Sequence, residues 1–457
     1  MNRTQTIVCG AALAAVIASG VGCELLDRLR HSPPNVIVVT IDTVRADHCS
    51  AYGYALETTP NLDRLGREGV RFEDVYAPMP TTAPSHASMF TSHYPASHGV
   101  LKNGFVLDPR FVTLAEALAA RGYDTAAFVA AYVVDHKFGL GQGFALYDDD
   151  FRGAQSTVPG KTWEGHDVSE GFDRRADEVS SRAGAWLERR RDGVRPFFLW
   201  VHFYDPHWPY VPPEPHRSRF RASAAGGIEE DVALYDGEIA FADAKLGELL
   251  DRLERAGLAA NTLVIATSDH GEGLGQHGHR QHGLLLYEEA VRVPLVLRWP
   301  GRLSRGQTVA GPVELVDLMR TILDLVGVPR QGMELQGRSL VPVLQGGKAA
   351  NPARLVVMQR RQFDTRNIEG RSVKGPKLAV RADRWKYIEA PEEGTKELYD
   401  LAADPGEIEN VADRFPAEVR SLASELGTWR QAHASSAPEQ TLSEHDVEAL
   451  KSLGYVR

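Results

Sequence analysis

The sequence predicts an α/β protein with a mostly parallel central sheet sandwiched by helices, joined to a small C-terminal antiparallel subdomain. Three uninterrupted apolar, β-branched runs, at 35–41, 197–203 and 262–268, are typical of strands buried on both faces. Segments with apolar residues at helical spacing lie between these runs, and such alternation favours a parallel sheet between two helical layers. After about residue 350 the strand pattern becomes alternating, which indicates a second, antiparallel sheet.

The remaining elements of the main domain follow from local patterns. Shorter apolar runs predict two further strands, at 124–129 and 295–299. Helical spacing predicts four helices, and the last three end near glycines, which commonly terminate helices; the ranges are 113–120, 176–191, 231–256 and 313–326.

The C-terminal part carries its own signals. The segment 377–389 alternates between apolar and polar residues, and 397–401 follows a turn-rich link, so both are predicted as antiparallel strands. The sequence from 416 onward is predicted as helices and a tail. Since 457 residues exceed one ordinary domain, we expect a leader at 1–23, a catalytic α/β domain at 34–350 and a C-terminal subdomain at 351–457.

Overall composition bounds the class of partner. Hydrophobic residues make up 43% of the chain and charged residues 25%, which is ordinary for a globular protein. The net charge of −10 argues against nucleic acid as a partner, because nucleic-acid binding usually needs a basic face.

The N-terminal segment has the pattern of an export signal. Arg3 precedes an apolar run at 7–21, which is shorter than the roughly 20 apolar residues of a membrane span. Cys23 then follows a stretch similar to a lipoprotein cleavage box, in which Gly20 takes the place usually held by leucine. A lipid anchor at Cys23, a plain cleaved signal and an uncleaved anchor stay open as alternatives. We expect an exported protein, periplasmic or membrane-anchored, that contacts a membrane only through such an anchor.

Beyond the leader the chain has a single cysteine, Cys49. No disulfide framework is therefore available. We interpret Cys49, which closely follows the first strand, as a buried thiol rather than a reactive one.

Carboxylates and a histidine follow two of the predicted strands. Asp42 comes directly after the run at 35–41, and Asp269 and His270 come directly after 262–268. Active sites of parallel sheets lie beyond the carboxyl ends of the strands. Carboxylate and imidazole groups brought together there can hold one divalent cation, and we predict Asp42, Asp269 and His270 as its ligands. The alternative for Asp42 is a turn or capping residue.

Thr82 is the candidate nucleophile. It lies in a proline-rich bend at 79–84, just before a helix predicted to start near Ser85. A helix N-terminus favours anions, and a metal ion or a base can activate an alcohol. The alternative is a capping or turn hydroxyl.

A loop rich in histidine and glycine follows the second metal motif. We predict functional roles for His270 and His282, whereas His277 and His279 fit a polar surface loop equally well. A further histidine, His207, follows the strand at 197–203.

Taken together, these motifs resemble the sulfatase family of the alkaline phosphatase superfamily. The matching segments occur in family order and span nearly all of 34–413; they are 35–47, 58–65, 82–91, 205–209, 268–272, 287–294, 299–301 and 398–405. The resemblance implies an alkaline phosphatase-like fold and hydrolysis of sulfuric or phosphoric esters. It also implies that Asp42, Asp269 and His270 bind the metal and that Thr82 takes the nucleophile position.

The same resemblance assigns the residues around the substrate. His207 and His282 take catalytic positions that contact the anion, with His282 near the place of a substrate lysine. His86 replaces the arginine beside the nucleophile and is predicted, with Asn103, to bind substrate.

The departures from the family pattern concern the chemistry. Thr82 stands where relatives carry a Cys or Ser that becomes formylglycine, and threonine cannot be converted in that way. Where the family has paired metal aspartates, this chain has Asp42 followed by Thr43, so one carboxylate is missing. Because imidazole from His270 completes the set, zinc or manganese is favoured over calcium or magnesium.

These features lead to one functional prediction with two alternatives. A group attached covalently to the single hydroxyl of threonine must be released by water, a route that is familiar for phosphoryl groups. The resemblance points the same way, because threonine nucleophiles occur in related phosphodiesterases and phosphonate-cleaving enzymes. We predict a metal-dependent hydrolase that cleaves a sulfate or a phosphate or phosphonate ester through Thr82, acting on a small anionic ester such as a glycan or lipid head group. The alternatives are a phosphoryl or head-group transferase and a non-catalytic protein that binds anions or glycans. The joint presence of the three predicted metal ligands and the Thr82 hydroxyl favours an enzyme.

Overall fold

The computed structural model describes residues 33–152, 173–190, 195–220, 226–346, 354–360 and 371–433, with short strand segments at 162–163, 166–167 and 366–368. The predicted leader at 1–23, including Cys23, and the predicted tail beyond 433 lie outside these residues, as does the predicted domain boundary at 350. Among the described residues, every helix is too short or too polar to cross a membrane.

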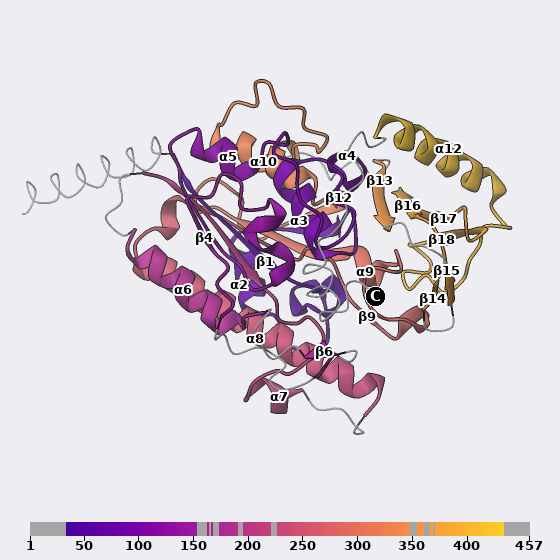
Figure 1. Ribbon diagram of the computed structural model, residues 1–457, viewed down its shortest axis with the longest axis horizontal. Coiled ribbons are helices and arrows are strands. Elements are labelled where there is room, and N and C mark those ends of the chain that lie inside the picture. The colour runs from indigo at the N-terminus through magenta and orange to yellow at the C-terminus, as the bar shows by residue number, and fades with distance from the viewer. Residues whose placement is uncertain are drawn as a thin grey trace, which may run out of the picture.

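An eight-stranded sheet forms the centre of the molecule (Figure 1). In spatial order its strands are β12 (Gln307–Glu314), β2 (Val70–Tyr76), β11 (Arg292–Arg298), β8 (Thr262–Thr267), β1 (Asn35–Ile41), β7 (Phe197–Phe203), β3 (Asp124–Phe128) and β4 (Leu146–Asp148). Seven of them run in the same direction, and β11 is antiparallel to both of its neighbours. The predicted mostly parallel sheet is confirmed.

The three longest apolar runs occupy the middle of this sheet. β1 pairs in parallel with β7 on one side and with β8 on the other. Every residue of the three strands is buried. Their carboxyl ends therefore meet in the interior of the molecule, where the surrounding core excludes water.

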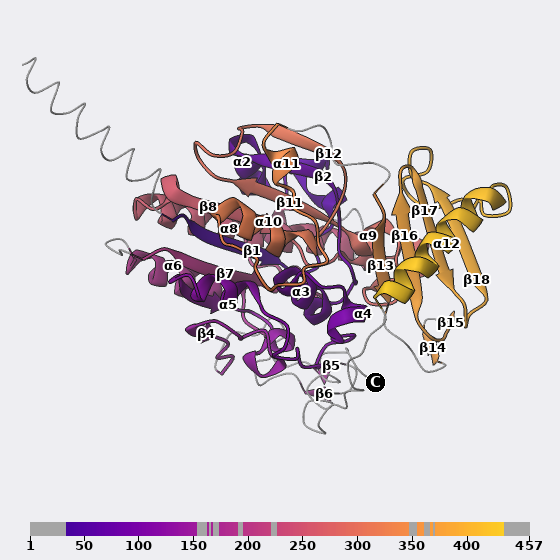
Figure 2. The same ribbon diagram turned by 90° about the horizontal axis from the view of Figure 1, so that it is seen from above.

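Helices cover both faces of the sheet, as Figures 1 and 2 show. One layer contains α2 (Pro60–Glu68), α6 (Ala176–Glu188) and α8 (Ile228–Arg255). The other contains α3 (Thr82–Thr91), α5 (Leu114–Ala119) and α10 (Asp317–Val326). Shorter helices lie in the segments that connect these strands and helices; they are α4 (Pro95–His98), α7 (His216–Arg219), α9 (Glu288–Val291) and α11 (Val341–Leu344).

Two contacts show how polar groups fix helix ends. Thr113 and Glu116 form a reciprocal capping box at the start of α5, with distances of 2.8 and 3.1 Å. On the other face, the buried carboxylate of Asp243 in α8 accepts hydrogen bonds from the backbone N–H groups of Asn61 and Leu62, each at 2.9 Å. A carboxylate at a helix N-terminus satisfies unpaired donors and the helix dipole, so Asp243 joins α2 to α8.

The C-terminal sheet is antiparallel, with the order β13 (Val356–Arg360), β16 (Lys377–Ala382), β17 (Trp385–Ala390) and β18 (Thr395–Asp400). One face packs against α12 (Pro416–Ala432), and the other packs against residues 284–291 of the main domain (Figure 2). Three two-stranded pairs complete the strands; they are β5 (Thr162–Trp163) with β6 (His166–Asp167), β9 (Gly273–Leu274) with β10 (Arg280–Gln281), and β14 (Arg366–Ile368) with β15 (Arg371–Val373).

Several predicted boundaries were wrong. The helix predicted from residue 313 begins at Asp317, because Val313 and Glu314 pair with β2 and complete β12. The segment 377–389 is a hairpin of two strands, β16 and β17, whose turn places Asp383 in the left-handed region with φ of 52°. The helix at α3 begins at Thr82, three residues before the predicted start.

A buried ion-pair network joins the main domain to the segment before β13. Arg354 lies 2.5 Å from Asp317 and 2.6 Å from Glu314, and all three side chains are at most 6% exposed. We predict that Arg354→Ala lowers the free energy of unfolding by about 3–5 kcal/mol, because two buried carboxylates lose their cation. Urea denaturation followed by circular dichroism measures the change.

The matched control is Arg414→Ala. Arg414 pairs with Glu409 at 2.6 Å, but the two side chains are 63% and 69% exposed. Water screens this pair, so its loss should cost less than about 1 kcal/mol. Equal losses in the two variants would contradict a structural role for the buried network.

Candidate active site

The predicted metal ligands and nucleophile converge at one edge of the sheet. Asp42 directly follows β1, Asp269 and His270 follow the adjacent β8, and Thr82 is the first residue of α3. Because β1 and β8 are parallel neighbours, the chain that leaves them emerges side by side. All four side chains are fully buried.

The ligand atoms lie close enough to share one ion. Nε2 of His270 is 3.6 Å from Oδ1 of Asp42 and 3.4 Å from Oδ2 of Asp269. Two ligands held about 2.1 Å from one ion at tetrahedral angles are about 3.4 Å apart. Nδ1 of His270 donates to the carbonyl of Gly271 at 2.9 Å, which leaves Nε2 with its lone pair for a metal.

Three of the four carboxylate oxygens of Asp42 and Asp269 have no hydrogen-bond partner among the described residues. Both oxygens of Asp42 and Oδ2 of Asp269 are buried without a hydrogen-bond partner among the described residues. A buried carboxylate is costly unless it is paired or binds a metal. The donor set, two carboxylates and an imidazole, therefore fits a divalent cation.

The charges of the metal-free cluster shift its proton equilibria. Burial raises the pKa of Asp42 to about 7, and Glu272 adds to this while His270 opposes it. Burial and the charge of Asp42 also raise the pKa of Asp269. Burial alone would lower the pKa of His270, but the charges of Asp269 and Asp42 raise it. These shifts reflect an excess of negative charge that a cation would neutralise.

The Thr82 hydroxyl touches the cluster. Its Oγ1 lies 3.3 Å from Nε2 of His270. Beside it, Oδ1 of Asn103 accepts a hydrogen bond from the backbone N–H of Ala83 at 2.9 Å, while Nδ2 of Asn103 is buried without a partner among the described residues. An unpaired amide donor at the start of α3 suits the predicted contact of Asn103 with an anion.

His86 has a different place from the one predicted. Its ring is fully buried, Nδ1 donates to the carbonyl of Thr82 at 2.9 Å, and Nε2 accepts from the hydroxyl of Thr40 at 3.0 Å. Burial lowers its pKa to about 4. With both ring nitrogens bonded to protein atoms, His86 joins Thr82 of α3 to Thr40 of β1 and has no ring nitrogen left to bind a substrate.

His207 and His282 lie together at the same centre. The ring of His282 is 4.4 Å from that of His270 and 5.1 Å from that of His207. Nδ1 of His207 lies 2.6 Å from the carbonyl of Trp208, and its ring stacks on Tyr204. Burial lowers the pKa of His207 to about 3 and that of His282 well below its usual value.

Of the two loop histidines on which the prediction was divided, His277 and His279, the first makes structural contacts. Its Nδ1 is 2.7 Å from Glu289, its Nε2 is 3.0 Å from the carbonyl of Glu407, and its ring stacks on Tyr287. It therefore joins the loop to the C-terminal part of the chain. The sequence could not indicate this, because Glu407 lies 130 residues away.

Two residues of the centre were missed as candidates. His202 lies within β7, fully buried, with Nε2 at 3.6 Å from Oδ2 of Asp42. The sequence feature that could have identified His202 is a polar residue inside an otherwise apolar strand beside β1. Glu272 is also fully buried, with Oε1 at 3.1 Å from Nδ1 of His282; its motif was noticed, but the carboxylate received no role.

Thr43 adopts an unusual backbone conformation next to Asp42. Its φ is 56°, which is costly for a β-branched residue, and its buried Oγ1 has no hydrogen-bond partner among the described residues. The hydroxyl of Tyr235 donates to its carbonyl at 2.7 Å and accepts from the N–H of Arg45 at 3.0 Å. The turn is therefore held from α8.

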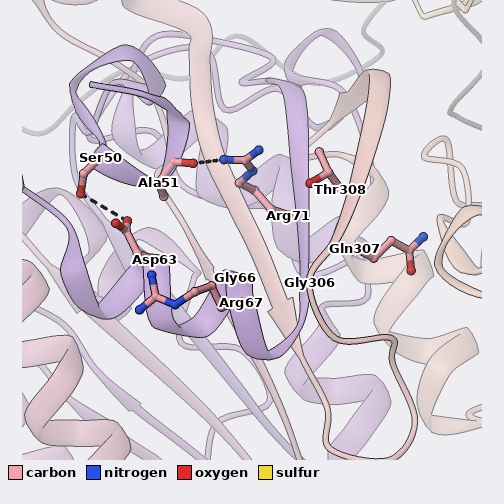
Figure 3. Close-up of a pocket in the computed structure, with 9 residues that line it drawn as sticks. All are labelled: Ser50, Ala51, Asp63, Gly66, Arg67, Arg71, Gly306, Gln307 and Thr308. Carbon is pink, nitrogen blue, oxygen red and sulfur yellow. Dashed lines mark hydrogen bonds between the residues drawn. The ribbon is translucent and has the colours of Figure 1, made fainter. Parts of the chain in front are cut away.

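Figure 3 shows a separate hollow of about 290 Å³ at the amino ends of β2 and β12, the sheet edge opposite the cluster. Two hydrogen bonds join residues that line it: Arg71 donates to the carbonyl of Ala51, and Ser50 donates to Asp63 at 3.3 Å. It contains none of the predicted site residues. Cys49, as expected, is a buried thiol, and burial raises its pKa.

The raised pKa of Asp42 predicts a pH dependence for the metal-free protein. Its folded-state pKa of about 7 exceeds the usual 3.8, so the protonated group favours folding below about pH 4, and this contribution is lost as the pH rises through 7. Relative to Asp42→Asn, the wild type should lose up to roughly 4 kcal/mol of unfolding free energy between pH 4 and 8. Denaturant unfolding in chelator at several pH values measures this difference.

The comparison with Asp42→Asn removes the opposing effect of the buried histidines. Their lowered pKa values, about 4 for both His86 and His202, make folding more favourable as the pH rises, in both proteins alike. Parallel stability curves for the two proteins would contradict the assignment of a strained, unneutralised carboxylate at position 42.

The sequence matches the sulfatase family over residues 34–328 and the C-terminal region of N-sulphoglucosamine sulphohydrolase over residues 275–431. It is 28% identical over 502 residues to the multifunctional alkaline phosphatase superfamily protein PehA of Trinickia caryophylli, covering 88% of this chain and 96% of that protein. It is 27% identical over 459 residues to choline-sulfatase of Rhizobium meliloti (strain 1021), covering 88% and 86%.

Solved structures share the fold. Phosphonate monoester hydrolase of Agrobacterium radiobacter superposes with a TM-score of 0.71 at 24% identity, over 88% of this chain and 96% of that one. The phosphonate monoester hydrolase SpPMH of Silicibacter pomeroyi gives a TM-score of 0.69 at 23% identity, over 88% and 96%. The central sheet, the buried cluster at its carboxyl edge and a family match across most of the chain lead to one conclusion: the protein belongs to the sulfatase family.

Proposed function

We propose that the protein is a metal-dependent hydrolase that cleaves phosphate or phosphonate esters through a covalent adduct on Thr82, with sulfate esters as the second candidate substrate class. Membership of the sulfatase family supports hydrolysis of sulfuric or phosphoric esters. The observation that carries the assignment of Thr82 is its position: Oγ1 lies 3.3 Å from Nε2 of His270, a nitrogen that is itself within 3.6 Å of both aspartates.

Asp42, Asp269 and His270 would hold the metal ion. Bound there, a divalent cation supplies charge that lowers the pKa of an alcohol and stabilises the anionic group under attack. The imidazole of His270 and the single carboxylate at position 42 favour zinc or manganese over calcium or magnesium.

The chain's own residues orient the reaction. Oγ1 of Thr82 forms the new bond to phosphorus or sulfur and gives up its proton, and the ester oxygen leaves with the electron pair of the broken bond and takes up a proton. The unpaired Nδ2 of Asn103 and the N-terminus of α3, both beside Thr82, bind the oxygens of the transferred group. His207 and His282 line the same centre, within reach of a leaving or entering oxygen.

The nucleophile favours phosphorus over sulfur. Threonine provides one hydroxyl, so its adduct is an ester that only an incoming water can open, and phosphoryl esters at metal centres are opened in this way. Names of relatives support both classes, since they include phosphonate monoester hydrolases and choline-sulfatase. Small anionic esters are therefore the substrate class to test, and glycan or lipid head groups are candidate sources of them.

We predict that Thr82→Ala lowers kcat/KM at least about a thousandfold, because the atom that forms the covalent bond is lost. Thr82→Ser keeps the hydroxyl and should retain substantial activity. The measurement is turnover of matched aryl phosphate, phosphodiester, phosphonate and sulfate esters, with zinc or manganese supplied.

Thr91→Ala serves as the matched control. Thr91 closes the same helix, and its hydroxyl donates to the carbonyl of Ala87 at 2.6 Å, so turnover should stay close to that of the wild type. Wild-type turnover by Thr82→Ala would remove Thr82 as the nucleophile. Turnover of the sulfate ester alone would assign the second substrate class.

We also predict that Thr43→Asp raises the affinity for calcium at least about tenfold. Calcium takes more oxygen ligands than zinc, and its affinity follows the number of ligand charges. The left-handed φ of 56° at this position accommodates aspartate better than threonine. Isothermal titration calorimetry with calcium and zinc measures the change.

Thr43→Asn is the matched control, because it has the same shape without the charge. It should bind calcium as weakly as the wild type does. Equal affinities in the Asp and Asn variants would show that position 43 does not contribute to the metal site.

A further inference from the structure

Glu272 is a buried carboxylate at the centre that neither the metal site nor the nucleophile uses. Its Oε1 lies 3.1 Å from Nδ1 of His282. The glutamate side chain is fully buried and only 8% of the histidine side chain is exposed, so this contact is shielded from water. A carboxylate oxygen accepts, so Nδ1 of His282 carries the hydrogen and Nε2 carries the lone pair.

The backbone of Glu272 is fixed from two sides. Nη1 of Arg45 donates to the carbonyl of Glu272 at 3.2 Å, and the guanidinium of Arg45 is itself held by Asp47 at 2.6 and 2.9 Å. The preceding residue, Gly271, packs against the carbonyl of Glu289 so closely that an added Cβ would lie 2.0 Å from that oxygen. Such support restricts the carboxylate, and through it the ring of His282, to one orientation.

The ring that Glu272 orients lies at the reaction centre. It is 4.4 Å from the ring of His270, whose Nε2 contacts Oγ1 of Thr82, and 5.1 Å from the ring of His207. A second glutamate–histidine pair is formed by His277 of this loop and Glu289 of α9, and its histidine ring stacks on Tyr287. Both pairs join a carboxylate to an imidazole. The ring of His282 contacts the candidate metal ligand His270, whereas the ring of His277 contacts Tyr287.

We propose that Glu272 is a positioning residue that holds His282 as the proton acceptor for the water that hydrolyses the Thr82 adduct. This inference rests on the proposed function of Thr82. The water oxygen forms a bond to phosphorus or sulfur, and its proton passes to Nε2 of His282. The bond to Oγ1 of Thr82 breaks, its electron pair stays on that oxygen, and the proton restores the hydroxyl. One water is consumed and one acid anion is released.

The test separates formation of the adduct from its hydrolysis. With an activated 4-nitrophenyl ester, Glu272→Gln should release about one equivalent of nitrophenol in a fast burst, followed by a steady state slowed about 10–100-fold. The burst rate should stay within about threefold of the wild type. Intact-mass spectrometry after quenching should show the adduct, and peptide mapping should place it on Thr82.

Matched variants define the outcome. His282→Asn should accumulate the same adduct, and the double variant should be no slower than the single ones, because the two residues act as a unit. Glu289→Gln changes the equivalent pair outside the centre and should show neither burst nor adduct beyond the wild type. His282→Asn also keeps the test decisive where Glu272→Gln unfolds.

Two results in Glu272→Gln and His282→Asn would overturn the inference. The first is that the burst and the steady state slow by the same factor and no adduct accumulates. The second is that the kinetics of both variants equal those of the wild type. Either result leaves the proposed function standing, provided Thr82→Ala is inactive. Failure of that proposal has a different signature, which is turnover by Thr82→Ala with no adduct on residue 82 in any variant.

Discussion

The excess of buried negative charge at the carboxyl edge of the sheet is the constraint on which the rest of the centre depends. Asp42, Asp269 and Glu272 are all fully buried within one water-excluded region, and burial raises the pKa of each. The groups packed around them are histidines and backbone donors, which offset only part of this charge. A cation bound at such a centre would neutralise this charge, and its binding would then stabilise the fold.

The fold leaves little freedom in how these groups meet. β8 and β1 are parallel neighbours in the dry middle of the sheet, so their carboxyl ends deliver Asp42 and Asp269 side by side. α3 is buried along its whole length, and His86 ties the carbonyl of Thr82 to Thr40 of β1. Thr82 is therefore positioned by backbone contacts in a buried core, as its proposed role as nucleophile requires.

The sequence predicts this centre well where strands are buried on both faces, because such strands have a continuous apolar pattern. It predicts the centre less well where side chains contact residues far away in the chain. The runs that form β1, β7 and β8 are uniformly apolar, so their strands and the acidic groups after them were predictable. β2 carries charged residues on its partly exposed positions, which hid it from a search for apolar runs.

Side-chain partners were harder to predict than positions. His86 stands next to the nucleophile in sequence, and that position suggested a substrate contact. One ring nitrogen of His86 instead accepts a hydrogen bond from Thr40, which lies 46 residues earlier in the chain. A local sequence pattern cannot show such a long-range contact. His202 was hidden for the opposite reason: one polar residue in an apolar strand does not break the strand pattern, yet register with Thr40 brings it beside Asp42.

The histidines of the centre point to a division of tasks. Burial lowers the pKa of His207 to about 3, and that of His282 also lies well below its usual value, so neither ring carries a positive charge near neutral pH in the metal-free centre. Charge on the transferred group must then be offset by the cation, by Asn103 and by the N-terminus of α3. A neutral imidazole can accept a proton from water, whereas a cationic side chain could not. In the proposed mechanism, threonine as nucleophile creates the need for such an acceptor, because its ester has no second hydroxyl to expel the group. In the proposed mechanism, Thr82 and His282 therefore serve one requirement, the hydrolysis of a threonine ester.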